Sequence, residues 1–137
     1  MHNIIHERLQ VLPPSARALV YGHDGWIVGG CTKYILGIND DIPKDIDIIV
    51  PFYEWGRACL IIPRGTLSNS FGGHKLTDQI AYVDGSKIAI DIDVWCGDVG
   101  WFLAHSKLFD GYAVHVTTHS ILLRSYGLQK EKHHGRN

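Results

Sequence analysis

An apolar run that carries two carboxylates, Asp45-Ile46-Asp47-Ile48-Ile49-Val50, constrains the fold of this chain more than any other stretch. Side chains alternate between the two faces of a β-strand, so Asp45 and Asp47 project together while the aliphatic residues between and after them enter a core. The Cα atoms of the two acids would lie about 6.5–7 Å apart, so both carboxylates can reach a shared divalent cation or a pair of cations. The run therefore predicts a half-buried strand with an acidic outer face.

The same alternation recurs downstream, over Lys87 to Trp95. In this segment Asp91, Asp93 and Trp95 share one face, and isoleucine and valine residues share the other. If this strand lies beside the first acidic strand in one sheet, it brings a third acid to the same cation site. Alternation alone does not choose between Asp91 and Asp93, because both point from the same face.

A paired-glycine turn precedes the first acidic strand. Trp26 to Val28 reads as a short buried strand, Gly29-Gly30 breaks it, and Thr32 to Leu36 can form a helix closed by Gly37. Glycines lack the side chains that would keep a triphosphate away from backbone N–H groups, and a helix N-terminus adds partial positive charge. The alternative interpretation is a tight turn that binds no ligand.

The remaining segments alternate between helical and extended patterns. Together with the acidic strands they predict an α/β (α+β) fold, a single-domain mixed β-sheet flanked by helices, over residues 1–128, with a polar, frayed tail at 129–137. We expect helices at 3–12, at 15–20 with Ser15 as the cap, at 53–60, at 97–105 and at 120–126. We expect strands at 69–76, where glycines lead into or interrupt the strand, and at 112–116.

Composition excludes several classes of protein. A chain of 137 residues with a formal net charge of −1 suits one domain and carries no global field for nucleic acid, although residues 124–136 are locally basic. Its three cysteines form no CxxC pair, and its nine histidines show no ligand spacing. No secretory signal or membrane-length apolar run is present. We therefore expect a cytoplasmic protein with no membrane partner.

The motifs occur in the order found in one known superfamily. The superfamily pattern begins with a Gly-Gly turn and a basic residue three positions on, which here are Gly29-Gly30 and Lys33. It continues with a Leu-Gly and an Asp-x-Asp strand, which here are Leu36-Gly37 and Asp45-x-Asp47. A second glycine turn and a third carboxylate strand follow at Phe71-Gly72-Gly73 and Ile92-Asp93-Val94. This pattern, from Trp26 to Trp95, resembles the catalytic head of the polymerase-beta-like nucleotidyltransferases, in particular that of poly(A) polymerases and CCA-adding enzymes.

The chain also departs from that pattern. Lys33-Tyr34 stands where the CCA-adding pattern usually has Arg-Asp, so the positive charge is kept and the acid is lost. The loop Ile38 to Lys44 is longer than in compact versions of the head. The family's additional domains, which select the base and hold the RNA, have no counterpart within these residues. Template-free tRNA end synthesis is therefore not expected of this chain alone.

The resemblance implies a chemistry and a set of site residues. Two Mg²⁺ ions would be held by Asp45, Asp47 and a third acid, for which Asp93 is favoured over Asp91 because Trp95 follows it on the same face. Gly29, Gly30 and Lys33 would face the phosphates of an NTP substrate. The implied reaction transfers a nucleoside monophosphate to a hydroxyl of RNA, protein or a small molecule. The alternative is a catalytically silent nucleotide-binding or regulatory module of the same fold.

Overall fold

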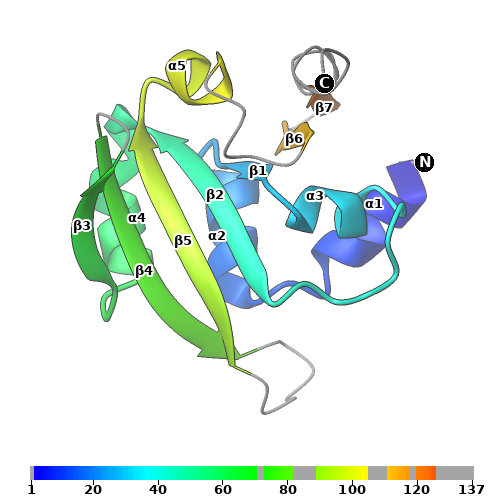
Figure 1. Cartoon of the computed structure of the whole chain (residues 1–137), viewed down its shortest axis with the longest axis horizontal. Coiled ribbons are helices and arrows are strands. Elements are labelled where there is room, and N and C mark those ends of the chain that lie inside the picture. The colour runs from blue at the N-terminus through cyan, green and yellow to red at the C-terminus, as the bar shows by residue number, and fades with distance from the viewer. Residues whose placement is uncertain (1, 71–72, 82–88, 105–110, 118–119, 126–137) are drawn as a thin grey trace, which may run out of the picture.

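The described part of the chain forms one seven-stranded mixed sheet with the strand order β3-β4-β5-β2-β1-β6-β7. The computed structural model describes residues 2–70, 73–81, 89–104, 111–117 and 120–125 (Figure 1). Strands β2 and β5 run parallel, and the other neighbours are antiparallel. The strands are β1 (Trp26–Val28), β2 (Asp45–Pro51), β3 (Thr66–Ser70), β4 (Gly73–Ala81), β5 (Ala89–Gly97), β6 (Tyr112–Val116) and β7 (Ile121–Ser125).

Short helices cover the sheet unevenly. Figure 1 shows α2 and α4 behind the central strands, whereas α5 sits at one end of them. The helical elements are α1 (His2–Leu9), α2 (Pro14–Gly22), α3 (Cys31–Ile35), the 3₁₀ turn η1 (Phe52–Glu54), α4 (Trp55–Ile61) and α5 (Val99–Ala104). Among the described helices the longest has nine residues, and none is long and apolar enough to cross a membrane.

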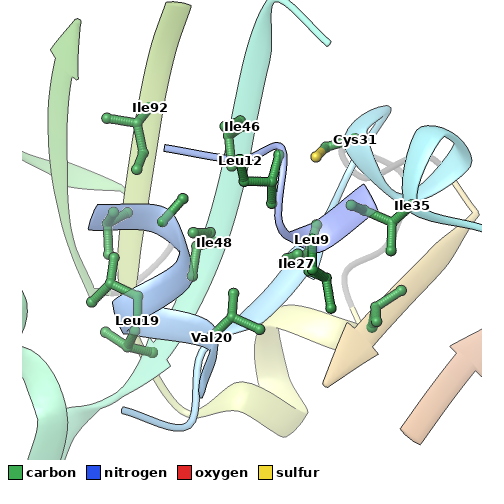
Figure 2. Packing of buried hydrophobic residues seen from close by; sticks show 14 of the residues in the cluster. Leu9, Leu12, Leu19, Val20, Ile27, Cys31, Ile35, Ile46, Ile48 and Ile92 are labelled. Atoms are coloured by element: carbon green, nitrogen blue, oxygen red, sulfur yellow. The ribbon is translucent and has the colours of Figure 1, made fainter. Parts of the chain in front are cut away.

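The main core lies between the helical layer and one face of the sheet. Figure 2 shows Ile46 and Ile48 of β2 and Ile92 of β5 on the side where Leu12 and Leu19 of the N-terminal segment pack. All five side chains are fully buried. Each such residue contributes about 1.5–3 kcal/mol of transfer free energy, so the alternation of the acidic strands is enforced by burial of their aliphatic face.

The opposite face of the sheet is only partly covered. Six buried residues from β1, β2, β5, α5 and β6 form a smaller cluster there, namely Val28, Ile49, Trp95, Phe102, Leu103 and Ala113. The rest of this face, beyond the cluster and α5, carries the polar and charged residues of β2, β4 and β5. The acids are therefore on a sheet face that the helical layer leaves open.

Most of the predicted elements are confirmed. Both acidic strands form, with the predicted alternation in β2 and in the described side chains of β5. The strand, glycine turn and helix at 26–36 are present, and Gly37 follows α3 with a left-handed φ of +78°. The fold is the predicted α+β arrangement of a mixed sheet flanked by helices. The predicted tail at 129–137 lies outside the described residues.

At the sheet edges one predicted strand is divided into two, and one predicted helix is wrong. The segment 69–76, predicted as a strand entered through or interrupted by glycines, contains parts of two strands, β3 and β4, which pair antiparallel with Ser70 opposite Gly73. Residues 121–125 form β7 instead of a helix, because they pair with β6, and Thr117 and Ser120 hydrogen-bond to each other beside this pairing. A short apolar run fits either structure by periodicity, and strand pairing decided between them here.

The predicted cap of the second helix is also wrong. Pro13 occupies the cap position without a side-chain hydrogen bond, and Pro14 begins the helix. Proline suits the first helical position because its fixed φ is already helical and its missing N–H has no partner there anyway. Ser15 consequently lies inside α2 instead of capping it.

Candidate functional site

The two acidic strands place their carboxylates side by side. Strand β2 pairs with β5 in parallel, so Asp45 is in register with Asp91 and Asp47 with Asp93. Paired residues of neighbouring strands share a face, so the acids of both strands lie on the open face of the sheet. The register thus joins two motifs that are 46 positions apart in the sequence into one acidic cluster.

Asp47 lies at the centre of this cluster. The pKa of Asp47 is raised from 3.8 to about 6, first by burial and then by the negative charges of Asp93 and Asp45, while the Lys75 ammonium opposes them. Like charges that are close together disfavour ionisation of each carboxyl group. Asp47 is therefore a partly buried acid held next to other acids, which is the electrostatic condition that a bound divalent cation relieves.

Asp93 is oriented by a neighbouring strand. The hydroxyl of Thr77 on β4 donates a hydrogen bond of 2.6 Å to Oδ1 of Asp93, and the two residues are in register. Such a partner fixes the carboxylate and leaves its second oxygen for another ligand. Asp45 is exposed at the start of β2. The register places Asp91 opposite Asp45 on β2 and Gln79 on β4, and the side chain of Asp91 is not among those that the structure describes.

The paired glycines have different roles. Gly29 is buried with a φ of +73°, and a Cβ at this position would lie 2.7 Å from Oδ2 of Asp47. Gly30 is exposed, and a Cβ there would meet nothing within 4 Å. The first glycine is therefore required by close approach to the Asp47 carboxylate and by its backbone conformation. The second borders the open space in front of the acids.

That space is a pocket of about 370 Å³ next to the acidic cluster. Its wall is formed by the glycine turn, the loop between α3 and β2, and the start of β2; the lining residues are Gly30, Cys31, Asn39, Asp41, Ile42, Pro43, Lys44, Asp45 and Asp47. This volume is within the range of small-molecule sites in proteins. The loop at 38–44, which the sequence showed to be long, supplies most of one wall.

An arginine from the first helix holds this loop in place. The Arg8 guanidinium donates to the carbonyl oxygen of Asn39 at 2.7 Å and to Oδ1 of Asp40 at 2.7 Å. It also donates to the carbonyl oxygen of Tyr34 at 2.9 Å and lies over the Tyr34 ring. Bidentate contacts of this kind orient a loop more strongly than a single exposed ion pair. The pocket wall is thus preformed.

Three lysines differ in where they lie relative to the acidic cluster. Lys33 lies in the last turn of α3, and it is not one of the residues that line the pocket, whereas Lys44 is. Lys75 of β4 is on the acidic face, with its ammonium 4.7 Å from the centroid of the Trp95 ring. The structure therefore brings together Asp45, Asp47, Asp93 and the glycine turn, and it adds Lys44 and Lys75, which the motifs had not indicated.

Cys31 is the nearest thiol to the cluster. It is buried, and burial together with the charge of Asp47 raises its pKa far above the ordinary value of 9.0. A thiol in this environment favours its protonated form, which is a poor nucleophile. The described cysteines are all free.

The donor set fits a hard divalent cation. Carboxylate oxygens suit Mg²⁺, and both burial and the neighbouring carboxylates raise the pKa of Asp47, which a bound divalent cation would offset. Within the described ranges, no three side chains of His, Cys, Asp or Glu are already arranged around one metal position.

Two residues of β4 at this site, Lys75 and Thr77, were not predicted from the sequence. Lys75 and Thr77 are separated by one residue on β4, so they share the face that pairs with Trp95 and Asp93. The alternation Lys75, Thr77, Gln79 around the buried Leu76 is the signal that could have identified them. The strand predicted from the sequence ends at Leu76, so it does not include Thr77 and Gln79.

Comparison with known proteins supports the fold. No protein-family model matches this chain, and no curated protein matches it either. Among solved structures, a CCA-adding enzyme in complex with CTP superposes with a TM-score of 0.53 at 17% sequence identity. The superposition covers 98% of this chain and 34% of that enzyme, so this chain spans about a third of its length. The chain shares its fold with the matched part of a nucleotidyltransferase.

Proposed function

We propose that this protein is a Mg²⁺-dependent nucleotidyltransferase that transfers a nucleoside monophosphate from an NTP to an acceptor hydroxyl. The observation that carries this proposal is the register of β2 and β5, which sets Asp47 beside Asp93 on an open sheet face. The pocket that contains Asp45 and Asp47 is bordered by the exposed Gly30, as a phosphate-binding turn would be. The fold shared with a CTP-bound CCA-adding enzyme is consistent with this assignment.

Asp45, Asp47 and Asp93 would hold the metal ions. When bound, two Mg²⁺ ions activate the acceptor oxygen and stabilise the negative charge on the departing pyrophosphate. In the reaction, the acceptor oxygen would form a bond to the α-phosphorus, the bond from that phosphorus to the pyrophosphate would break, and the hydroxyl proton would pass to solvent water. Thr77 keeps Asp93 oriented through this step, and Gly29 leaves room for the Asp47 carboxylate.

The pocket wall would receive the nucleotide. Gly30 is exposed at the turn, so the triphosphate can approach the backbone there without meeting a side chain. Lys44 supplies a cation on the same wall, and Ile42 and Pro43 supply apolar surface for the sugar or base. RNA, protein and small-molecule acceptors all present the hydroxyl that this chemistry needs.

The test is a transfer assay with α-labelled NTPs. Each of the four NTPs is incubated with the protein, Mg²⁺ and total RNA, a protein extract or a small-molecule extract, and labelled product is sought in each fraction. We expect label in one fraction, and we expect it to disappear with EDTA and with the Asp47→Asn variant. Mg²⁺-dependent binding of NTP without transfer to any acceptor would instead identify a silent nucleotide-binding module. Absence of both binding and transfer would refute the proposal.

A further inference from the structure

Lys75 of β4 carries a positive charge that acts on Asp47 at the centre of the acidic cluster. It is in register with Trp95, so its side chain leaves β4 on the same face as Thr77, Asp93 and Asp47. The ammonium lies 4.7 Å from the Trp95 ring centroid, and Trp95 itself is 8% exposed. An ammonium over a tryptophan face is held by the negative potential of the ring. Lys75 is therefore a positioned cation, not a freely moving surface lysine.

The site around Lys75 suits a phosphate group. Lysine is a compact point charge with three donors, and it commonly binds phosphates beside a metal centre. On the open face, Ser68 of β3 is in register with Lys75, and Thr77 lies two residues further along β4. This polar strip is on the opposite side of the acids from the pocket that contains Lys44 and Gly30. A phosphate bound here would lie over β4 and approach the acids of β5 and β2 from that side.

Resting on the nucleotidyltransferase assignment above, we infer that Lys75 is the built-in counter-cation of the acidic cluster without metal and a phosphate-binding residue once metal is bound. A divalent cation at Asp45, Asp47 and Asp93 neutralises the charge that attracts Lys75 and repels its ammonium. The ammonium is then available for a phosphate brought to the same face. This phosphate belongs either to the NTP or to a phosphodiester next to the acceptor hydroxyl.

The inference predicts effects of opposite sign from one substitution. Lys75→Met keeps the length and apolar stem that packs on Trp95 but removes the charge. Without the competing ammonium, Mg²⁺ or Mn²⁺ alone should bind about three- to tenfold more tightly. The affinity for a phosphate ligand in the presence of metal should fall by about tenfold, since a charged hydrogen-bond donor is lost. Lys75→Arg keeps the charge and should remain close to the parent in both measurements.

The matched control is Arg57→Met. Arg57 is exposed on α4, which packs on the sheet face opposite the acids, so this variant changes net charge equally without touching the cluster. Calorimetric titrations of parent, Lys75→Met, Lys75→Arg and Arg57→Met would use Mn²⁺ alone, Mg²⁺ with an NTP, and Mg²⁺ with a short oligoribonucleotide. Circular dichroism verifies that each variant is folded.

The three titrations separate the sources of the phosphate. Weaker NTP binding by Lys75→Met assigns the contact to the nucleotide, and weaker oligoribonucleotide binding, with a salt dependence reduced by about one charge, assigns it to the acceptor. If Lys75→Met matches Arg57→Met in all three titrations, the inference is wrong. Tighter metal binding with no loss in either phosphate titration would reduce Lys75 to a structural counter-ion and overturn its phosphate role. A parent protein that binds none of the three probes would refute the nucleotidyltransferase assignment itself.

Discussion

Replacing Asp47 with asparagine should stabilise the metal-free protein. The Asp47 carboxylate is partly buried beside Asp45 and Asp93, and its pKa is raised from 3.8 to about 6. At about 1.4 kcal/mol per unit of pKa, this corresponds to about 3 kcal/mol of destabilisation when Asp47 is ionised. Asparagine keeps the shape and removes the charge. In a chain of this size a change of 1 kcal/mol moves Tm by roughly 3–4 °C, so the variant should melt about 10 °C higher at pH 8.

The effect must depend on pH in a defined direction. The native state binds the Asp47 proton more tightly than the unfolded chain does. The stability that the protonated carboxyl group contributes is therefore complete below pH 3.8 and is lost as the pH rises through 6. Above that pH, only the parent carries the ionised carboxylate. At pH 4.5 the native carboxyl group is largely protonated, and the advantage of Asp47→Asn should shrink to about a third of its value at pH 8.

Thermal unfolding followed by circular dichroism in EDTA, at pH 8 and pH 4.5, measures both quantities. The control is Asp45→Asn, which removes the same charge from an exposed position on the same strand and should stabilise the protein less. A Tm for Asp47→Asn at or below that of the parent at pH 8 would show that the carboxylates are not in repulsive contact. An advantage of equal size at both pH values would rule out ionisation of Asp47 as its cause.

Three further substitutions test the supports of the site. Gly29→Ala should lower the free energy of unfolding in urea by about 1–2 kcal/mol and weaken metal binding at least tenfold, because it strains a left-handed residue and displaces the adjacent Asp47 carboxylate. Gly30→Ala should fold like the parent. Equal effects of the two substitutions would contradict this reasoning. Thr77→Val should cost about 1 kcal/mol and lower metal affinity severalfold, as Asp93 loses its donor, and an unchanged metal affinity would argue against a positioning role. Asp93→Asn should abolish Mg²⁺-dependent transfer while Asp91→Asn retains most of it, and the reverse pattern in the labelled-NTP assay would move the third ligand two residues along β5.

Local patterns were sufficient for the central elements of the fold. The period-two alternation of Asp45 to Val50 predicted both the strand and its acidic face, because burial of the intervening isoleucines leaves one arrangement of side chains. The same reasoning placed Asp93 and Trp95 on one face of β5. Gly37 was identified as the end of a helix because glycine tolerates the left-handed conformation found there.

Relations between distant segments could not be predicted in the same way. The register that pairs Asp47 with Asp93, and the hairpin that brings Lys75 and Thr77 to the site, depend on strand pairing across the sheet. Nothing local to Arg8 indicates that it holds a loop about 30 residues away. The apolar run at Ile121 fits a helix or a strand by periodicity, and pairing with β6 decided it.

Nucleotide binding with and without metal tests the central claim most directly. Because the acids and the glycine turn come together only in the native state, an NTP at 100 times its dissociation constant should stabilise the fold by about 2.7 kcal/mol when Mg²⁺ is present. Thermal unfolding with each NTP at millimolar concentration measures this shift. We predict a rise in Tm with at least one NTP that is lost in EDTA and in the Asp47→Asn variant. An unchanged Tm with every NTP in the presence of Mg²⁺ would contradict the assignment of a nucleotide site to this acidic cluster.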